Sequence, residues 1–501
     1  MDQSKQYFKR SSGVLLPVSS LPSPYGIGGF GRDARLWAEF LGEAGQSFWQ
    51  ILPLSPADGS GSPYQSVSAF AGDGNYIDLE TLCCEGFLDP ADYTGVKWSD
   101  SGQRVDYGSL DILRAPLLGK AFSRFKETGA PGISTLDSFI SRNSWVDDYC
   151  LYMAIKAAHG GRPWFEWEEP LRARQRGALD EIRVSYAEDY RYHAFIQYQH
   201  RRQWKTLREY ANSRGIRVIG DVPIYVALDS ADVWANPALF QLDEKGLPTE
   251  VAGYPPDALS DYGQLWGNPL YNWNVMAQNG YRWWTERLRS SFGLYDVVRI
   301  DHFRGLESYF AIPSGTVPAA GQWKKGPGEE FIDAVKRALP DACFIAEDLG
   351  APSEAVDRLL EYSGFPGMKV LQFAFDPLGD KENRPYKYPR NTVVYPGTHD
   401  NDTVKGWAEN TQELYVDHAI EYIGVRSREE LPNGMIRVAM QSAADLAIIQ
   451  MQDWLGLGSE ARINTPSTMG GHNWSWRLDS GALTDSLAAE MARMTATYDR
   501  G

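Results

Sequence analysis

Eight short runs of β-branched and other apolar residues, each ending in polar residues, recur along the 501-residue chain. They cover residues 13–20, 47–56, 216–226, 296–305, 343–350, 368–376, 392–402 and 446–456. Stretches with helical periodicity, several of them closed by glycine, separate most of these runs. Eight strands that alternate with helices are typical of a (β/α)8 TIM barrel. The sequence therefore predicts an α/β protein whose single barrel spans residues 1–501.

Two intervals between the predicted strands are too long for a single crossover helix. Residues from about 84 to 190 contain several amphipathic helix candidates, which predict a helical insertion. Residues from about 227 to 290 are rich in Pro, Gly, Asn and Trp. This composition predicts an irregular insertion beside the active-site cleft.

The overall composition narrows the class of partner. The formal net charge is −16 and no Lys/Arg block stands out, which argues against a nucleic-acid or anionic-membrane partner. The four cysteines have neither metal-ligand spacing nor the density of a disulfide scaffold, so we expect a reducing compartment. No apolar run is long enough for a signal peptide or a membrane span. We therefore expect a cytoplasmic protein.

Residues 296–305, "DVVRIDHFRG", place an unusual concentration of charge at a strand end. Because side chains alternate along a strand, Arg299 and Asp301 point to the same face. One interpretation is a structural ion pair at the rim of the sheet. The other is that Arg299 holds Asp301 ionised, which suits nucleophilic attack better than proton donation.

Further polar side chains follow the other predicted strands, and barrel active sites lie at such strand ends. They are Asp221, Glu347, Asp348, His399, Asp400, Asn401 and Asp402. The chain also has 17 Trp, 27 Tyr and 20 Phe residues, and aromatic faces are what a sugar-binding cleft uses. Paired carboxylates in such a cleft favour glycoside chemistry. A metal-dependent hydrolase stays open as an alternative, since Asp and His clusters also bind divalent ions.

Electrostatics suggests a role for each carboxylate in a glycosyl transfer. Asp301 is the expected nucleophile. Glu347 is the expected general acid/base, which requires that apolar surroundings and neighbouring carboxylates raise its pKa. Asp400, with His399, is expected to bind the hydroxyls of the reacting sugar and to favour its distorted form. Two carboxyls about 5 Å apart would indicate retention through a covalent glycosyl-enzyme.

Several motifs together resemble the amylomaltases, the 4-α-glucanotransferases of the α-amylase superfamily. The resemblance runs from "GVLLPVSSLPSPYGIGGFG" through "RIDHFRG", "IAEDLG" and "GTHDND" to "GLGSEARINTP" and "NWSWR", nearly the whole chain. It implies the same three roles for Asp301, Glu347 and Asp400, and α-1,4-glucans such as maltooligosaccharides and amylose as substrates. It also implies no cofactor, no required metal and no C-terminal β-sandwich domain, and only about 45 residues follow the eighth predicted strand.

The resemblance further implies a set of substrate-binding residues. They are Tyr64, Asp221, Gln264, Trp266, Asn268, Arg299, His302, Asp376, His399, Asn401 and Trp474. For Trp266 and Trp474 core packing is the alternative, because tryptophan is mostly buried. Nothing in the sequence indicates the oligomeric state.

Three departures from the family pattern affect substrate binding. Ala258 and Leu259 stand where many relatives have Tyr and Phe, and Gly59 replaces a tyrosine. The stretch 383–388 is about two residues shorter than expected. We expect the reaction type to survive while chain-length preference or ring formation shifts. A retaining α-glucan hydrolase and a non-catalytic glucan-binding protein are the two alternative functions.

Overall fold

The computed structural model describes residues 8–57, 59–99, 102–127, 129–256, 262–377, 379 and 381–501. Each of the eight predicted strand segments contributes one strand to a parallel sheet with the order β10-β11-β12-β1-β2-β3-β6-β9. The strands are β1 (Ser11–Leu15), β2 (Phe48–Gln50), β3 (Arg217–Val222), β6 (Val297–Ile300), β9 (Phe344–Ala346), β10 (Gly367–Val370), β11 (Thr392–Tyr395) and β12 (Leu446–Gln450). Their side chains are almost all buried, as the apolar runs predict.

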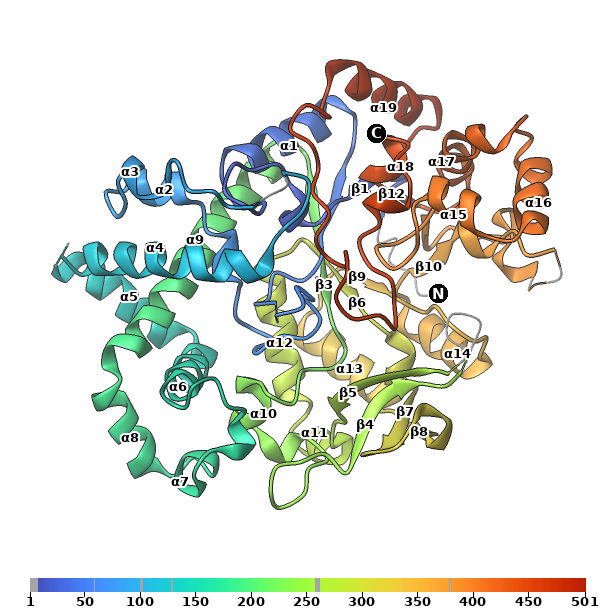
Figure 1. Ribbon diagram of the computed structural model, residues 1–501. Coiled ribbons are helices and arrows are strands. Elements are labelled where there is room, and N and C mark those ends of the chain that lie inside the picture. Colours follow the sequence, from blue (N-terminus) through green and yellow to red (C-terminus); the bar gives the residue numbers. More distant parts are fainter. Residues whose placement is uncertain are drawn as a thin grey trace.

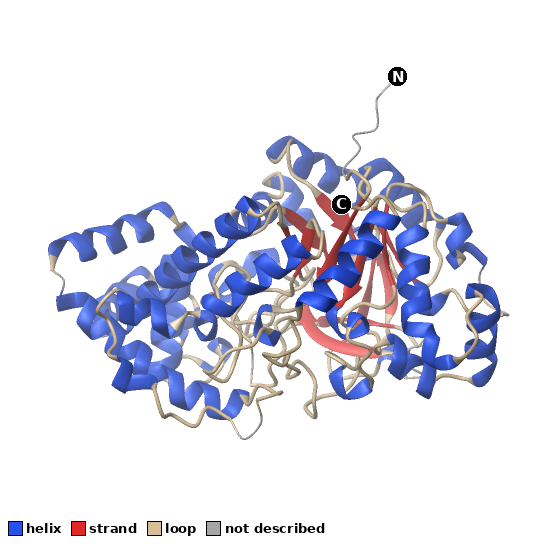
Figure 2. Ribbon diagram, turned by 90° about the horizontal axis from the view of Figure 1, so that it is seen from above, coloured by secondary structure: helices blue, strands red, loops and turns tan. Residues whose placement is uncertain are grey.

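The sheet curls so that its two ends, β9 and β10, meet. The backbone amide of Ala346 donates to the carbonyl of Pro366 (2.9 Å), and the amide of Met368 donates to the Asp348 carboxylate (2.7 Å). Helices lie on both sides of the strands in Figure 2. The predicted (β/α)8 barrel is confirmed.

Amphipathic helices connect most of the barrel strands (Figure 1). They are α1 (Arg32–Glu43), α12 (Arg282–Phe292), α13 (Gly328–Ala338), α14 (Glu354–Ser363), α15 (Val404–Asn410), α16 (Glu413–Ile423) and α17 (Leu431–Gln441), while α19 (Asp485–Thr497) follows the last strand. Between β10 and β11 the described residues form only 3-10 turns. Pro377, Pro385 and Pro389 interrupt this connection, and proline does not fit a helix interior.

The long interval between β2 and β3 is helical. It contains α2 (Leu79–Cys84), α3 (Pro90–Tyr93), α4 (Tyr107–Glu127), α5 (Ala130–Arg142), α6 (Ser144–Ala158), α7 (Glu169–Arg172), α8 (Arg176–Ser185) and α9 (Ala187–Ser213). The expected end of the insertion near residue 190 falls inside α9, because this long helix also leads into β3. The division into a barrel and two insertions stays a prediction.

The second interval is less irregular than its composition suggests. It contains the short helices α10 (Ala231–Ala235) and α11 (Trp273–Gln278) and two strands, β4 (Glu250–Tyr254) and β5 (Gln264–Pro269). These strands join β7 (Ser308–Pro313) and β8 (Gln322–Lys325), which follow β6, in an antiparallel sheet with the order β5-β4-β7-β8. β5 contains Gly, Asn and Pro, which are rare in strands, so its sequence does not predict a strand. β4 pairs with β7, more than fifty residues later, and such a distant pairing cannot be predicted from the sequence pattern.

The segment after β12 contains α18 (Met451–Trp454), a 3-10 turn and α19, and no strand among residues 451–501. A C-terminal β-sandwich is therefore absent from this part of the chain, as expected. The fully buried Arg500 donates to the carbonyls of Ser11 (2.9 Å), Met440 (2.6 Å) and Ala444 (2.9 Å). This side chain ties the start of β1 to α17 and to the loop that precedes β12.

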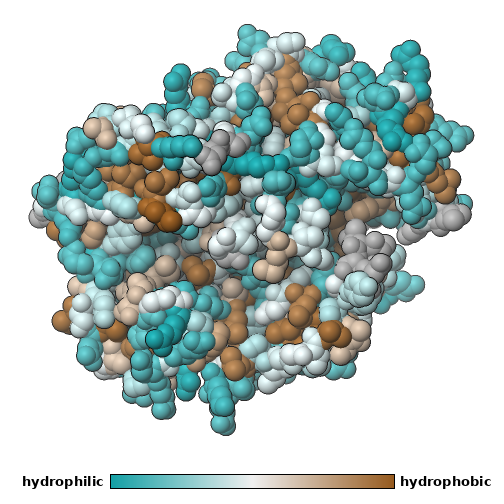
Figure 3. All heavy atoms as spheres, viewed as in Figure 1, coloured by the Kyte–Doolittle hydropathy of each residue, from teal (hydrophilic) through white to brown (hydrophobic). Residues whose placement is uncertain are grey.

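Polar residues cover most of the face shown in Figure 3, and apolar residues form small patches among them. Within the described ranges, no helix combines the length and the apolar character that a membrane crossing requires.

Candidate active site

The ends of β3, β6 and β9 bring three predicted side chains to one rim of the barrel. Asp221 lies opposite Arg299 in the parallel register of β3 and β6. Past the strand ends, the amide of Asp301 donates to Val222 O (3.1 Å), and the amide of Glu347 donates to Ile300 O (3.0 Å). Backbone hydrogen bonds therefore hold Asp301 and Glu347 in place directly after their strands.

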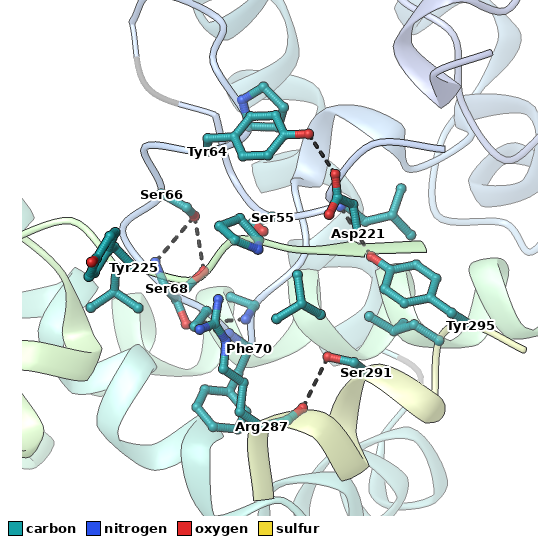
Figure 4. Close-up of a pocket in the computed structure, with 18 residues that line it drawn as sticks. Ser55, Tyr64, Ser66, Ser68, Phe70, Asp221, Tyr225, Arg287, Ser291 and Tyr295 are labelled. Carbon is teal, nitrogen blue, oxygen red and sulfur yellow. Dashed lines mark hydrogen bonds between the residues drawn. The ribbon is translucent and has the colours of Figure 1, made fainter. Parts of the chain in front are cut away.

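A chain of short hydrogen bonds connects five of the predicted side chains. Arg299 Nη1 donates to Asp221 Oδ2 (2.6 Å) and to Asp301 Oδ1 (3.0 Å). The Tyr64 hydroxyl donates to the same Asp221 oxygen (2.6 Å) and lies 2.9 Å from His399 Nε2. Figure 4 shows the Tyr64 hydroxyl facing Asp221. The ion pair expected at Arg299 is present, and it is part of a network around Asp221.

A small cavity of about 30 Å³ lies next to Asp221 (Figure 4). Its polar lining includes Ser66, Ser68, Arg287 and Tyr225. Asp221 Oδ1 is buried and has no hydrogen-bond partner among the described protein atoms. A cavity of this size has room for about two water molecules.

Glu347 is the more buried of the two central carboxyls. It is 9% exposed, and its oxygens accept from the backbone amides of His302 (2.7 Å) and Leu349 (2.9 Å). Burial raises the pKa of Glu347 to about 8, and the Asp301 charge acts in the same direction, while Arg299 and the His302 amide oppose it. A carboxyl with such a pKa carries a proton at neutral pH.

The pKa of Asp301 is also raised, to about 7, because burial and the charges of Asp221 and Asp400 outweigh the Arg299 cation. We expected Arg299 to hold Asp301 firmly ionised, and this expectation was too strong. Arg299 Nη1 is shared between two carboxylates, and burial disfavours the charge. Asp301 accepts a hydrogen bond from Arg299, whereas Glu347 accepts from the backbone amides of His302 and Leu349, so Glu347 holds its proton to the higher pH.

Asp400 lies at the edge of the cleft with 43% of its side chain exposed. Asn464 Nδ2 donates to Asp400 Oδ1 (2.6 Å), and Arg462 Nη2 donates to the Asp400 carbonyl (2.7 Å). His399 Nε2 lies 3.4 Å from the Asp400 carboxylate, and burial lowers the pKa of this imidazole. Sequence reasoning missed Asn464 and Arg462, although the "GSEARINTP" motif that contains them was among the family matches.

Aromatic rings line two sides of this group of carboxyls. The Trp266 ring meets His302 edge to face (4.9 Å between centroids), and its Nε1 donates to Gln264 Oε1 (3.0 Å). Trp474 packs against Tyr64 (5.6 Å) and has a left-handed φ of 63°. Both tryptophans are partly buried and pack against the hydrophobic core with part of their surface, so substrate binding by Trp266 and Trp474 stays a prediction.

Other predicted residues have structural contacts. Asn268 is buried and donates to Val226 O (2.9 Å), and Asn401 Oδ1 closes its own turn by accepting from the Thr398 amide and hydroxyl, both at 2.9 Å. The Asp376 carbonyl accepts from Arg384 (3.0 Å). Substrate binding by Asn268, Asn401 and Asp376 stays a prediction.

Two further acidic residues of the strand-end motifs accept hydrogen bonds from backbone amides. Asp348 accepts from the Met368 amide, and Asp402 accepts from the Thr403 amide (2.8 Å) and the Ser459 hydroxyl (2.6 Å). Within the described part of the chain, no three His, Cys, Asp or Glu side chains are grouped as a metal site requires.

The structure describes two of the three departures from the family pattern. Ala258 and Leu259 lie outside the described residues. Gly59 is exposed, and a Cβ atom added there would have nothing within 4 Å. The short stretch 383–388 forms 3-10 turns between β10 and β11.

A (β/α)8 barrel that carries the Asp301 and Glu347 carboxyls at adjacent strand ends has the arrangement typical of enzymes that act on glycosides. Residues 16–484 match the family described as 4-alpha-glucanotransferase, glycoside hydrolase family 77. The chain belongs to this family.

Individual relatives agree with this assignment. The 4-alpha-glucanotransferase of Streptococcus pneumoniae serotype 4 is 46% identical over 496 residues, 98% of each chain. That of Thermus thermophilus is 44% identical and covers 98% of this chain and 99% of its own. Among solved structures, the amylomaltase of Streptococcus agalactiae in complex with acarbose is 40% identical, with a TM-score of 0.96 over 98% of this chain and 100% of that one. The resemblance to amylomaltases is confirmed.

Proposed function

We propose that Asp301, Glu347 and Asp400 carry out the 4-alpha-glucanotransferase reaction of this chain. The reaction moves an α-1,4-glucan segment from a maltooligosaccharide or amylose donor to the 4-hydroxyl of an acceptor glucan or glucose. The observation that carries this assignment is the pair of carboxyls at the ends of β6 and β9, of which Glu347 is buried and has the higher pKa.

In the first step, the Asp301 carboxylate attacks the anomeric carbon of the donor and forms a covalent glycosyl ester. Glu347 gives its proton to the departing 4-oxygen, so the leaving glucan departs as a neutral alcohol. In the second step, the Glu347 carboxylate takes the proton from the acceptor 4-hydroxyl. That oxygen displaces Asp301, and two inversions give net retention.

The neighbouring side chains act on the sugar between the two steps. Asp400, held by Asn464, is placed to bind hydroxyls of the reacting sugar and to favour its oxocarbenium-like form. The Tyr64–Asp221–Arg299 network surrounds the same sugar. A relative from Streptococcus agalactiae is an amylomaltase in complex with acarbose, which supports an α-glucan ligand for this cleft.

Transfer requires that an acceptor glucan outcompete water for the glycosyl-enzyme. The partly buried Trp266 ring, which packs against His302, offers an apolar surface for that acceptor. If the surface fails to hold the acceptor, the same carboxylates give hydrolysis. A cytoplasmic location, where maltodextrins would be the substrates, remains a prediction.

The test is to incubate the purified protein with maltotriose in the presence of a chelator and to follow glucose and longer oligosaccharides. Transfer gives a ladder above maltotriose with glucose as co-product. Glucose and maltose without longer chains indicate the hydrolase alternative, and loss of activity with the chelator indicates a metal enzyme. An Asp301→Asn variant as active as the parent would contradict the assignment of the nucleophile.

A further inference from the structure

The second arginine of "RIDHFRG", Arg304, has no part in the mechanism above. It lies in the 3-10 turn Phe303–Leu306 that follows β6, and only 6% of it is exposed. Within the described ranges, no carboxylate lies at salt-bridge distance from it. Burying a cation without a carboxylate is costly, so the contacts that it does make require an explanation.

Arg304 contacts the segment after β9 and the antiparallel sheet together. Its Nη1 donates to the carbonyl of Ala351 (2.9 Å) and to the hydroxyl of Tyr254 on β4 (3.1 Å). The Ala351 amide donates to the same hydroxyl (3.1 Å), so Arg304, Tyr254 and Ala351 are joined by hydrogen bonds in a closed ring. The guanidinium also lies over the ring of Trp323 on β8, 4.6 Å from its centroid, and this cation–π contact stabilises the buried charge.

The segment that Arg304 holds supplies one of the two amide donors to Glu347. Leu349, whose amide binds Glu347 Oε1, is separated from Ala351 only by Gly350. Gly350 has a φ of 117°, and a Cβ atom there would lie 2.8 Å from the Tyr254 hydroxyl. The close approach of this segment to Tyr254 therefore fixes the direction of the Leu349 amide.

The same network reaches the second amide donor and the aromatic surface. The Tyr254 ring packs edge to face against His302 (5.9 Å), whose amide binds Glu347 Oε2, and stacks beside Trp266 (6.5 Å). One buried cation thus connects both donors of the acid/base carboxyl to the sheet that carries Trp266.

We infer that Arg304 is a positioning residue that fixes the Glu347 carboxyl relative to the surface on which the acceptor glucan binds. This inference rests on the proposed role of Glu347. Arg304 touches neither the substrate nor the reacting atoms. Its effect is on proton transfer at Glu347, since a misplacement of about 1 Å can cost roughly 100-fold in rate.

The test compares Arg304→Lys, Tyr254→Phe and Arg304→Met with the parent enzyme on maltotriose. Arg304→Lys keeps the positive charge but lacks the planar guanidinium group with its several N–H donors. Tyr254→Phe removes the hydroxyl that Arg304 and Ala351 share and changes no charge. We expect kcat to fall about 10- to 100-fold in all three, with the donor KM changed less than about threefold. Because the Leu349 amide stabilises the ionised carboxylate, we also expect the basic limb of the pH profile to move to higher pH.

A second substrate separates positioning from general damage. Fluoride leaves α-maltotriosyl fluoride without needing a proton, so the burst of fluoride should stay within about threefold of the parent rate in every variant. Arg114→Met is the matched control: Arg114 is also buried, donates to the Ile77 carbonyl and lies 5.9 Å over Trp98, remote from Glu347 in the chain's helical part. It should lower the thermal midpoint and leave kcat and the pH profile unchanged.

Two results would overturn the inference. One is that Tyr254→Phe and Arg304→Lys behave like Arg114→Met, with lower stability and a parent-like kcat and pH profile. The other is that the fluoride burst falls as much as turnover of maltotriose. A Glu347→Gln enzyme in the same panel that still disproportionates maltotriose would instead refute the proposed function itself.

Discussion

Asp301 and Glu347 carry the same functional group, but the structure gives them different neighbours. Asp301 bonds to the Arg299 guanidinium, whereas Glu347 bonds only to backbone amides, and burial raises the pKa of both. The two carboxyls therefore titrate as a pair, with one proton that resides mainly on Glu347. The alternation of side chains along β6 was enough to place Arg299 beside Asp301. The sequence does not indicate that Asp221 also accepts a hydrogen bond from Arg299, because Asp221 lies on β3, 78 residues before Arg299.

We predict a bell-shaped dependence of kcat/KM on pH for maltotriose disproportionation. Activity should rise as Asp301 loses its proton near pH 7 and fall as Glu347 loses its proton near pH 8. Glu347→Gln should lower kcat by about 10²- to 10⁴-fold and abolish the basic limb. A basic limb that persists in this variant would assign that ionisation to another group.

At the scale of the elements, the antiparallel sheet supplies a surface that the barrel lacks. Trp266 lies on β5 and reaches His302, so we predict that Trp266→Leu weakens acceptor binding by about 0.5–1.5 kcal/mol, or 2- to 12-fold in KM. Steady-state kinetics with glucose as acceptor measure this effect, and the ratio of hydrolysis to transfer should rise. Tyr362→Leu, at an exposed tyrosine on α14, is the control. Equal effects of both substitutions would contradict a role for Trp266.

The barrel strands were predictable and the second sheet was not, for a physical reason. A buried parallel strand is a continuous apolar run, which the sequence displays directly at segments such as 446–450. β5 has alternating exposure and contains Gly267 and Pro269, and its sheet is completed by strands from beyond β6. The carboxyls that we propose as catalytic follow barrel strands, which is why the sequence pattern could indicate them. Asn464 and Tyr254 belong to loops and strands whose position depends on tertiary packing.

On the scale of the whole molecule, buried carboxyls make stability depend on pH. Burial raises the pKa of Asp453 to about 7, as it raises those of Asp301 and Glu347. A carboxyl whose pKa is raised on folding stabilises the protein fully below its unfolded value, and this contribution is lost as the pH rises through the folded value. We therefore predict that the thermal midpoint falls progressively from about pH 4, near the unfolded values of these carboxyls, to about pH 8, and levels off above it.

Asp453→Asn tests this prediction away from the catalytic pair. The Val404 amide at the start of α15 donates to Asp453 Oδ1 (2.7 Å), and an asparagine retains this acceptor while removing the titration. The fall of the thermal midpoint with pH should become shallower in this variant, as measured by calorimetry. An unchanged slope would show that Asp453 is ionised over the whole range.

Arg500 connects parts of the barrel that are far apart in the sequence. It donates to carbonyls of β1, α17 and the loop before β12. Arg500→Met removes the arginine donor from the Ser11 and Ala444 carbonyls, at about 1–3 kcal/mol each, while the Met440 carbonyl keeps its hydrogen bond from Arg10 (2.8 Å). We predict that the unfolding free energy falls by roughly 3 kcal/mol or more, with kcat at 25 °C unchanged, as chemical denaturation and maltotriose turnover would show. A parent-like denaturation midpoint would mean that water replaces the arginine.

The meeting of β9 and β10 has a consequence for how this barrel opens. β9 is paired in register with β6, and β10 with β11, but the Ala346 amide and the Asp348 carboxylate make the hydrogen bonds between the two strands. Local opening follows the boundary where the fewest bonds must break. Hydrogen–deuterium exchange should therefore be faster at the Ala346 and Met368 amides than in the β1–β12 ladder. Glu347 directly follows Ala346, so local opening between β9 and β10 would displace the Glu347 carboxyl before it disturbs the rest of the barrel.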